Sequence, residues 1–477
     1  MTRCFTPRFD VGAPIPPLRD LGRVHVLAIG GAGMSAVARL ALQAGLTVSG
    51  SDQRDSAVLR ALREAGATIF IGHDPAHVEG VDTVVVSSAI RPDNPEVVRA
   101  HELGIRVLHR SQALAATMGT QWRVAVAGAN GKTTTSSMLT SALRHAGHDP
   151  SFALGGELSE RATNAALGGG SAFIAEADES DGSFLVYHPD IAIVTNVQPD
   201  HLDFYGTYAV VQEAYAEFAS TIRDGGLLVA CADDPGSAAL AESARAGGQR
   251  VVTYGTSDGA DLRLSDVKAE GMNAQAVLTE GGVSRALHLA VPGAHNVLNA
   301  SAAYAAATRG LGVDPEAILA GLTAFGGTRR RFETRGRVGE VVVVDDYAHN
   351  PGKVEAVVNT AAQIAAPGRL IVVFQPHLYS RTRDFADGFA AGLAAADRVI
   401  LLDIYGAREE PIAGVTSEVI AAPLRERGTP AVTLGRDDAV TEVVARTRPG
   451  DLVLTVGAGD VTELGPQILA ELAKAPI

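Results

Sequence analysis

A glycine-rich turn followed by a lysine and three threonines carries the clearest chemistry in this sequence. The segment 123–139 reads RVAVAGANGKTTTSSML, with four apolar residues before Gly128 and a Lys132–Thr133 pair directly after Gly131. The apolar run predicts a buried strand, and Lys132 begins a predicted helix. In such a turn, backbone N–H groups and the helix N-terminus bind phosphate, the lysine reaches the outer phosphates, and the threonine hydroxyl can bind Mg²⁺. We predict a polyphosphate site here; the alternative is an ordinary helix cap.

Two segments further on end in acidic and histidine-bearing loops. They read SAFIAEADESDGS over 171–183 and DIAIVTNVQPDHLDFYG over 190–206. Each begins as an apolar strand, and an α/β sheet places its ligands beyond the carboxyl ends of such strands. If both strands neighbour the strand of the phosphate loop, their polar residues meet near it and can serve Mg²⁺; otherwise they form solvated turns. These residues are Glu176, Asp178, Glu179, Asp181, Asp200, His201 and Asp203.

A second glycine turn lies near the N-terminus. Over residues 24–52 the pattern is strand, glycine turn, helix and strand, and Gly31, Gly33 and Ala36 fit G-x-G-x-x-G/A. Asp52 follows at about the distance of a ribose-binding acid. Taken alone, this pattern indicates a dinucleotide site, or a tight turn without a ligand.

Polar residues also follow predicted elements in the second half of the chain. His295, Asn296 and Asn299 open an alanine-rich helix and could contact a base or ribose, or simply cap the helix. The run RRR at 329–331 is expected either to be exposed to solvent or to supply one or two arginines that bind phosphate. Four later segments (341–351, 369–382, 398–414 and 451–460) each run from a buried strand into a polar loop. Their loops bring together Asp345, Tyr347, His349, His377, Tyr379, Arg381 and residues 457–460.

Composition limits the class of protein. The chain has 477 residues, 46 % of them hydrophobic, and a net charge of −14, which argues against a nucleic-acid surface. Cys4 and Cys231 are too few for a disulfide or metal framework, and we expect a tail thiol and a core thiol. No signal peptide or bilayer-spanning apolar run is present, so we expect a soluble cytoplasmic protein without a membrane partner.

The predicted fold class is α/β with three domains, each an open, mostly parallel sheet flanked by helices. Strands are expected near 68–72, 82–90 and 105–110 in the first sheet, followed by a helix and connector over 112–121. We predict a loose tail over 1–20, a Rossmann-like domain over 21–119, a P-loop ATPase-like domain over 120–327 and a Rossmann-like domain over 328–477.

Taken together, the motifs resemble one family. In order along the chain they read IGGAGMS, GKTTT, EADESD, TNVQPDHLDFYG, HNVLNA, RRRFE, DDYAHNP, QPHLYSRT and GAGD. From Val24 onward the sequence is similar to the ATP-dependent Mur ligases of peptidoglycan synthesis. No lysine lies between His201 and Arg223, which resembles the alanine-adding branch. The loop residues 128–131 and the HNP of 349–351 depart from the commoner versions of those motifs.

The resemblance implies that L-alanine is joined to the carboxylate of UDP-N-acetylmuramate through an acyl phosphate. ATP and two Mg²⁺ ions are expected, with Mn²⁺ as a substitute. The glycine turn at Gly31 would then hold a UDP-sugar diphosphate in place of a dinucleotide. Two alternatives remain: a ligase that attaches recycled peptides to the same UDP-sugar, and a nucleotide-switched binding protein. The sequence leaves the oligomeric state open.

The resemblance also assigns residues to each ligand. The expected ATP-binding residues are Gly128, Ala129, Asn130, Gly131, Lys132, Thr133, Thr134, Asn296, Asn299, Arg331 and Asp345. The expected UDP-sugar-binding residues are Gly31, Ala32, Gly33, Met34, Ser35, Asp52 and Ser88. The expected metal ligands are Thr133, Glu176 and His201, and the amino acid would face Tyr347, His349, His377 and Arg381. Catalytic roles are implied for Lys132, His201, His349 and Arg381.

Overall fold

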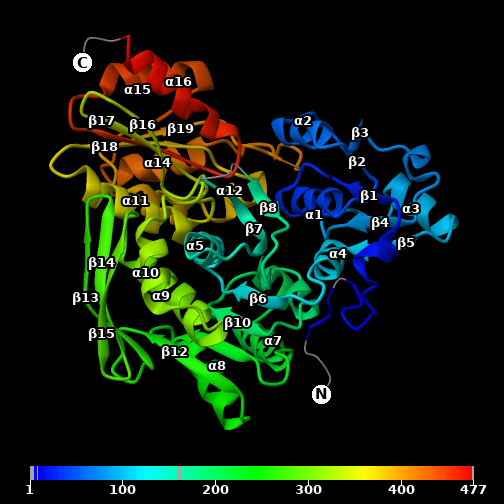
Figure 1. Ribbon diagram of the computed structural model, residues 1–477. Helices are drawn as coiled ribbons and strands as arrows, with labels where there is room; N and C mark the ends of the chain where they lie inside the picture. Colours follow the sequence, from blue (N-terminus) through cyan, green and yellow to red (C-terminus); the bar gives the residue numbers. More distant parts are fainter. Residues whose placement is uncertain (1–4, 8, 160–162, 408, 475–477) are drawn as a thin grey trace. The chain divides into compact units, whose positions relative to one another are not determined.

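The computed structural model describes residues 5–7, 9–159, 163–407 and 409–474 (Figure 1). Over these residues the chain forms three β-sheets with helices packed on them, which confirms the predicted α/β class. Two units divide the chain: Met1–Lys268 with Ala274–Gly326, and Ala269–Asn273 with Gly327–Ile477. The first unit carries the first sheet and all of the second except residues 269–273, and the second unit carries the third sheet. The domain limits predicted at residues 20, 119 and 327 stay predictions.

The first sheet has five parallel strands in the order β3-β2-β1-β4-β5. Its strands are β1 (Val24–Leu27), β2 (Val48–Asp52), β3 (Thr68–Ile71), β4 (Thr83–Val86) and β5 (Arg106–His109). The helices of this part are η1 (Leu18–Leu21), α1 (Ala32–Gln43), α2 (Ala57–Glu64), η2 (Pro75–Val78), α3 (Pro95–Glu102) and α4 (Arg110–Thr117). The predicted strand, turn, helix and strand over 24–52 is therefore present, with the glycine turn at the carboxyl end of β1.

The second sheet has ten strands in the order β15-β14-β13-β12-β11-β10-β6-β9-β7-β8. Its strands are β6 (Trp122–Ala127), β7 (Ser151–Leu158), β8 (Thr163–Ala166), β9 (Ala172–Glu176), β10 (Ile191–Val194), β11 (Leu227–Cys231), β12 (Arg250–Gly255), β13 (Leu262–Glu270), β14 (Asn273–Glu280) and β15 (Val283–Leu289). Its helices are α5 (Lys132–His145), η3 (Ser183–Val186), α6 (Leu202–Tyr205), α7 (Tyr208–Ser220), α8 (Pro235–Ala246), α9 (Ala294–Ala305), the π-helical turn η4 (Ala306–Gly310) and α10 (Pro315–Thr323). The strand of the phosphate loop, β6, pairs in parallel with β9 on one side and β10 on the other.

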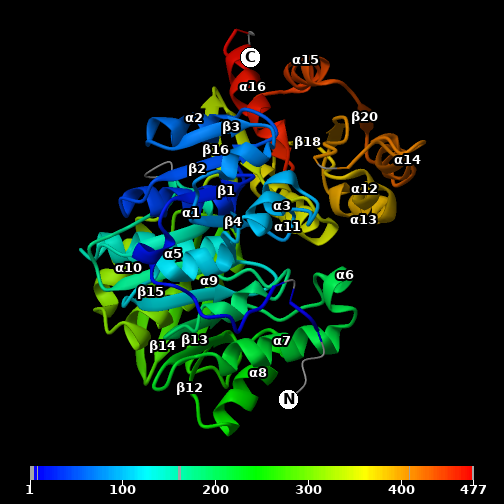
Figure 2. The ribbon, with the colours of Figure 1, turned by 90° about the vertical axis from the view of Figure 1, so that its right-hand side faces the viewer.

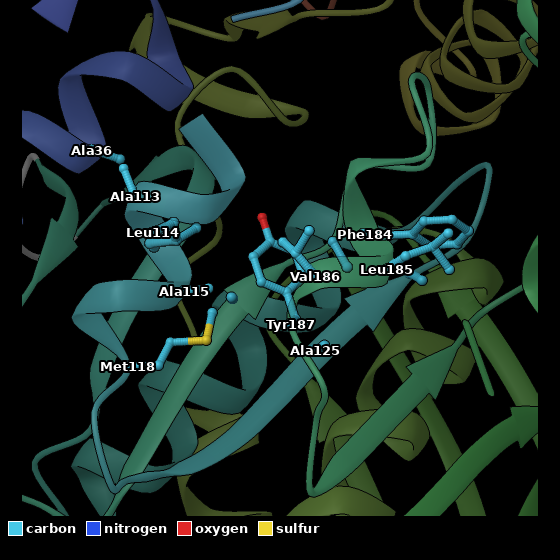
Figure 3. Close-up of a cluster of buried hydrophobic side chains, with 14 of the residues drawn as sticks. Ala36, Ala113, Leu114, Ala115, Met118, Ala125, Phe184, Leu185, Val186 and Tyr187 are labelled. Atoms are coloured by element: carbon cyan, nitrogen blue, oxygen red, sulfur yellow. The ribbon is translucent and has the colours of Figure 1, made fainter. Parts of the chain in front are cut away.

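One apolar core joins the first two sheets. Figure 3 shows part of it: Leu114 of α4 and Met118, which follows α4, lie on one side of Tyr187, which follows η3. The same core includes Val26 of the first sheet, so a single buried region runs from one sheet to the other. Because hydrophobic burial is the main stabilising term in folding, this shared core holds the two sheets in one unit. It thereby positions the carboxyl ends of their strands relative to each other.

The third sheet has six strands in the order β16-β17-β21-β18-β19-β20, antiparallel only at β16 among the described pairs. Its strands are β16 (Glu333–Val338), β17 (Val341–Asp346), β18 (Leu370–Phe374), β19 (Arg398–Leu401), β20 (Ala431–Thr433) and β21 (Leu452–Val456). Its helices are α11 (Pro351–Ala365), α12 (Tyr379–Asp384), α13 (Ala386–Leu393), α14 (Glu418–Glu426), α15 (Arg436–Arg446), η5 (Asp460–Glu463) and α16 (Leu464–Leu472). Apolar cores cover both faces of this sheet.

The N-terminal segment differs from its prediction. A loose tail was expected over residues 1–20, but Phe5 and Val11 are only 8 % exposed and belong to the core that joins the first two sheets. This segment is rich in proline, and its apolar side chains have no period that would reveal their burial. Cys231 is buried as expected, and Cys4 lies outside the described residues. Among the described helices, none has the length and apolar character needed to cross a bilayer.

Candidate active site

The phosphate loop follows β6 and has backbone angles that require glycine. Gly128 has φ 136° and Gly131 has φ 85°, both in the left-handed region that residues with a Cβ rarely adopt. A Cβ on Gly128 would overlap the Thr195 hydroxyl, and a Cβ on Gly131 would lie 2.5 Å from Asn299 Oδ1. Lys132 begins α5 immediately afterwards. The predicted order of strand, glycine turn and helix is therefore present, and phosphate binding by the N-terminus of α5 stays a prediction.

Lys132 lies at the centre of this loop. Its Nζ donates to the carbonyl oxygen of Gly128 at 2.6 Å and to Glu179 Oε1 at 2.9 Å. Burial by itself would lower the pKa of Lys132, but the nearby carboxylates of Glu179 and Glu176 outweigh burial and raise this pKa. Lys132 therefore remains a cation in a partly buried site, where its charge acts on neighbouring anions with little screening.

Two of the predicted metal ligands meet beside this lysine. Thr133 Oγ1 donates to Glu176 Oε2 at 2.8 Å, because β9, which ends at Glu176, pairs with β6. His201 follows β10 on the other side of β6, and its Nε2 lies 3.7 Å from Glu179 Oε1. Across the described residues, no three or more His, Cys, Asp or Glu side chains form a group that could hold a metal by themselves. The set fits Mg²⁺, which keeps several waters and takes further oxygen ligands from phosphates.

The two predicted asparagines of α9 lie against the phosphate loop. Asn299 Oδ1 accepts a hydrogen bond from Thr135 Oγ1 at 3.2 Å, and its Nδ2 donates to Asn296 Oδ1 at 3.0 Å. Asn296 Nδ2 donates in turn to the carbonyl oxygen of Pro292 at 2.7 Å. Both side chains are buried. This chain of amides connects α5 to the start of α9; contact with adenine stays a prediction.

The glycine turn of the first sheet is closed by Asp52. Its Oδ2 accepts the N–H of Gly30 at 2.9 Å, and its Oδ1 accepts the N–H of Gln53 at 2.8 Å. Gly31 precedes α1, whereas Met34 and Ser35 are buried beneath the turn. The carbonyl oxygen of Ala32 accepts from Asn164 Nδ2 at 2.9 Å.

Two residues that the sequence analysis did not assign, His109 and Arg110, connect this turn to the acidic loop. Arg110 Nη1 lies 3.5 Å from the position that a Cβ on Gly33 would occupy. Its Nη2 lies 2.6 Å from Asp178 Oδ2. A guanidinium between a glycine turn and a carboxylate can bind the oxygens of a phosphate. The available signal was the His-Arg pair at the carboxyl end of β5, at the ligand-binding edge of the sheet.

Ser88 and His109 meet at Asp181 of the same loop. Ser88 Oγ donates to Asp181 Oδ2, and His109 Nε2 lies 3.1 Å from Ser88 Oγ and 3.5 Å from Asp181. Burial lowers the pKa of His109 to about 4, so the imidazole is neutral at pH 7. Ser88, a predicted UDP-sugar residue, thus lies on the link between the first sheet and the acidic loop.

The second unit brings together the four residues predicted for the amino-acid side. The ring centroids of Tyr347 and His349 are 5.2 Å apart, and those of His349 and His377 are 6.0 Å apart. Arg381 Nη1 donates to the carbonyl oxygen of His349 at 3.4 Å. Tyr405, which the sequence analysis did not assign, stacks on His377 at 5.8 Å. The loops after β17, β18 and β19 meet because these strands are parallel and share one sheet.

Asp345, predicted for the ATP side, lies in the interior of the second unit. It is fully buried, and its two oxygens accept hydrogen bonds from Thr455 Oγ1 at 2.6 Å and Thr462 Oγ1 at 2.8 Å. Arg331 lies with its guanidinium carbon 5.5 Å from the centre of the Tyr347 ring, near the amino-acid-side residues. The ATP roles of Asp345 and Arg331 stay predictions.

His349 is a neutral hydrogen-bond acceptor at pH 7. Burial lowers its pKa from 6.5 to about 4, and the Arg381 cation contributes in the same direction. Its Nδ1–H donates to the carbonyl oxygen of Tyr347 at 2.9 Å, so Nε2 carries the lone pair. Such a nitrogen can accept a hydrogen bond from an amine or ammonium group at neutral pH.

This low pKa predicts acid sensitivity of stability. Because the folded pKa lies below the unfolded value, the stability due to neutral His349 is present above pH 6.5 and is lost as the pH falls toward 4. We expect the unfolding free energy to fall by up to about 2 kcal/mol between pH 7 and pH 5 from this residue. Denaturant unfolding of wild type and His349→Gln at both pH values measures it. An equal loss in both proteins would contradict the assignment.

Comparison with known proteins identifies the family. Residues 23–122 match the catalytic domain of the Mur ligase family, residues 126–307 match the Mur ligase middle domain, and residues 330–459 match the glutamate ligase domain of Mur ligases. The chain belongs to the Mur ligase family. All three matches follow one another along the chain in the order of its three sheets.

Named relatives of this Mur ligase cover nearly its whole length. The UDP-N-acetylmuramate–L-alanine ligase of Kineococcus radiotolerans is 55 % identical over 97 % of this chain and 99 % of its own. The ligase of the same name from Saccharopolyspora erythraea is 50 % identical over 95 % of this chain and 94 % of its own. A crystal structure of the UDP-N-acetylmuramate-alanine ligase of Thermotoga maritima is 29 % identical, with a TM-score of 0.81 over 95 % of this chain and 99 % of that one. A murein peptide ligase from Psychrobacter arcticus is 26 % identical, with a TM-score of 0.71 over 96 % of this chain and 100 % of that one.

Proposed function

We propose that this Mur ligase joins L-alanine to the carboxylate of UDP-N-acetylmuramate at the expense of ATP, in the synthesis of peptidoglycan precursors. The observation that carries the proposal is the 50–55 % identity, over nearly the full length, to ligases named for this reaction. The murein peptide ligase from Psychrobacter arcticus is similar in fold but only 26 % identical. We therefore prefer L-alanine to a recycled peptide as the amine substrate. In line with the sequence analysis, we propose a cytoplasmic location.

The first unit would bind the two anionic substrates. We assign the ATP phosphates to residues 128–134, with Lys132 offsetting their charge. We assign the UDP-sugar diphosphate to residues 31–35, with Arg110 reaching toward it from the start of α4. Both sites lie at carboxyl ends of parallel strands, where α/β sheets bind their ligands. Two Mg²⁺ ions, or Mn²⁺, would be held among Thr133, Glu176 and His201 and would neutralise phosphate charge as the anions approach each other.

The reaction would proceed in two steps. A carboxylate does not react with an amine in water, so its oxygen first attacks the γ-phosphate and forms an acyl phosphate, releasing ADP. The neutral amine of L-alanine then attacks the acyl carbon and displaces phosphate. Lys132 would stabilise the charge that develops on the transferred phosphoryl group. In the second unit, His349 Nε2 would accept a hydrogen bond from the alanine amine and orient it, and Arg381 would bind the alanine carboxylate.

Isotope transfer tests this proposal. UDP-N-acetylmuramate labelled with ¹⁸O in its carboxylate is incubated with ATP, Mg²⁺ and L-alanine, and the released phosphate is analysed by mass spectrometry. One ¹⁸O atom per phosphate is expected, because the attacking carboxylate oxygen leaves with the phosphoryl group. Replacing L-alanine with the tripeptide of a recycling ligase should give little product. Unlabelled phosphate would contradict the acyl phosphate, and faster ligation of the tripeptide would favour the recycling activity.

A further inference from the structure

The N-terminal segment contacts both loops that carry candidate site residues. We call its described residues 5–7 and 9–12 the N-terminal strap. Figure 2 shows this segment in dark blue, running past α7 toward the N-terminus. Phe5 is 8 % exposed, and its ring lies 5.2 Å from that of Tyr205 and 6.2 Å from that of Phe204, both edge-on. Such aromatic pairs add to the stabilisation from burial alone.

Tyr205 connects Phe5 to the two loops of the candidate metal site through hydrogen bonds. Its hydroxyl donates to the carbonyl oxygen of Glu179 at 2.5 Å, and its backbone N–H donates to the carbonyl oxygen of His201 at 3.0 Å. His201 has φ 53°, a left-handed conformation that a non-glycine residue keeps only when its surroundings hold it. The ring of Phe5 therefore packs on the residue that connects Glu179 to His201.

The strap also covers the turn of the acidic loop. A Cβ on Gly182 would lie 3.0 Å from Phe5 Cε2 and 3.5 Å from Pro7 Cγ. Gly182 N–H donates to the carbonyl oxygen of Glu179 at 3.1 Å, so this turn is the one that presents Glu179 to Lys132. Phe5 and Pro7 thus pack directly against this turn.

A second part of the strap contacts the first sheet. The ring of Phe9 stacks on His109 with centroids 4.1 Å apart and planes 13° apart. Gln112 Nε2 donates to the carbonyl oxygen of Asp10 at 3.1 Å. His109 lies beside Asp181 on the acidic loop. Phe9 and Asp10 of the strap therefore contact the start of α4, whereas Phe5 contacts α6.

We propose that the N-terminal strap positions Glu179 and His201 for the reaction and that Phe5 is its central positioning residue. The inference rests on the proposed function, because it assigns these loops to the metal and phosphate site. Phe5 touches none of the three substrates in this scheme. It acts through Tyr205 and Gly182, whose contacts set the backbone of both loops. Partners hydrogen-bonded to metal ligands change metal affinity by roughly 10–100-fold, and Phe5 acts one contact further out, so we expect the lower end of that range.

Phe5→Ala tests the strap in the full-length protein. We expect the Mg²⁺ concentration for half-maximal ligation to rise roughly tenfold, with a smaller change in kcat at saturating Mg²⁺. Amide hydrogen exchange, measured without substrates or metal, should become roughly tenfold faster in residues 178–183 and 201–206. Exchange in α9 should not change, which shows that the rest of the first unit stays folded. Phe5→Leu, which keeps an apolar side chain, should restore most of both properties.

Ile15→Ala is the matched control. Ile15 follows in the same N-terminal segment and packs partly buried on the same core, but it has no aromatic ring to contact α6 or His109. Its Mg²⁺ dependence and the exchange of both loops should match wild type. Unchanged exchange of the two loops in Phe5→Ala would overturn the proposal, whatever the activity. Failure of the wild type to ligate L-alanine would instead contradict the proposed function and leave the exchange result to decide the strap.

Discussion

The Lys132→Met variant is expected to lose ligation by roughly three orders of magnitude. Lys132 Nζ is the cation bound within the phosphate loop, and methionine keeps much of the side-chain volume without the charge. The substitution also leaves the Glu179 carboxylate buried without its cation. Because an unpaired buried charge is costly, we expect the unfolding free energy to fall by about 3 kcal/mol. Product formation and denaturant unfolding measure the two effects.

A double variant separates catalysis from stability. Lys132→Met with Glu179→Gln removes both charges of the pair, so most of the lost stability should return. Ligation should remain low, because the phosphate cation is still absent. Recovery of ligation together with stability would show that Lys132 matters only as the partner of Glu179. That result would contradict the phosphate-loop assignment.

Gly131→Ala is expected to reduce ligation by roughly 100-fold. Alanine at φ 85° is strained, and its Cβ would lie 2.5 Å from Asn299 Oδ1. Relief of this collision moves either the loop or Asn299, whose amide accepts from Thr135. A displacement of about 1 Å in a positioned site is enough for a loss of this size. Steady-state ligation at saturating ATP measures the effect.

Gly147→Ala isolates the contribution of backbone strain. Gly147 has nearly the same angle, φ 83°, but no heavy atom within 4 Å of the position of a Cβ. Both variants should therefore lose about 1–2 kcal/mol of stability from the left-handed backbone, whereas only Gly131→Ala should lose ligation. Equal ligation in the two variants would show that the contact between Gly131 and Asn299 has no role in the site.

Local sequence patterns determined the elements and the chemistry at their ends. The phosphate loop could be predicted because its glycines, lysine and strand are adjacent in sequence, and backbone sterics at positive φ select glycine there. The amino-acid-side residues could be assigned to one sheet edge because each follows an apolar strand, and parallel strands share a carboxyl edge. The resemblance to Mur ligases rested on these same short segments and is confirmed by the family matches.

Only the tertiary structure shows which strand ends lie next to each other. The sequence placed acidic residues after two strands but did not reveal that β6 lies between β9 and β10, which brings Glu176 to Thr133. The pair between Arg110 and Asp178 joins residues 68 positions apart, and no local rule predicts a contact over that distance. The burial of Phe5 was missed for the same reason. The apolar residues of this proline-rich segment have no regular period, and the surface that covers Phe5 comes from α6 and the acidic loop, about 200 residues later. Secondary-structure propensity and residue spacing reflect interactions over a few residues. The order of the strands depends on the apolar core that the two sheets share, and that core is built from residues throughout the first unit.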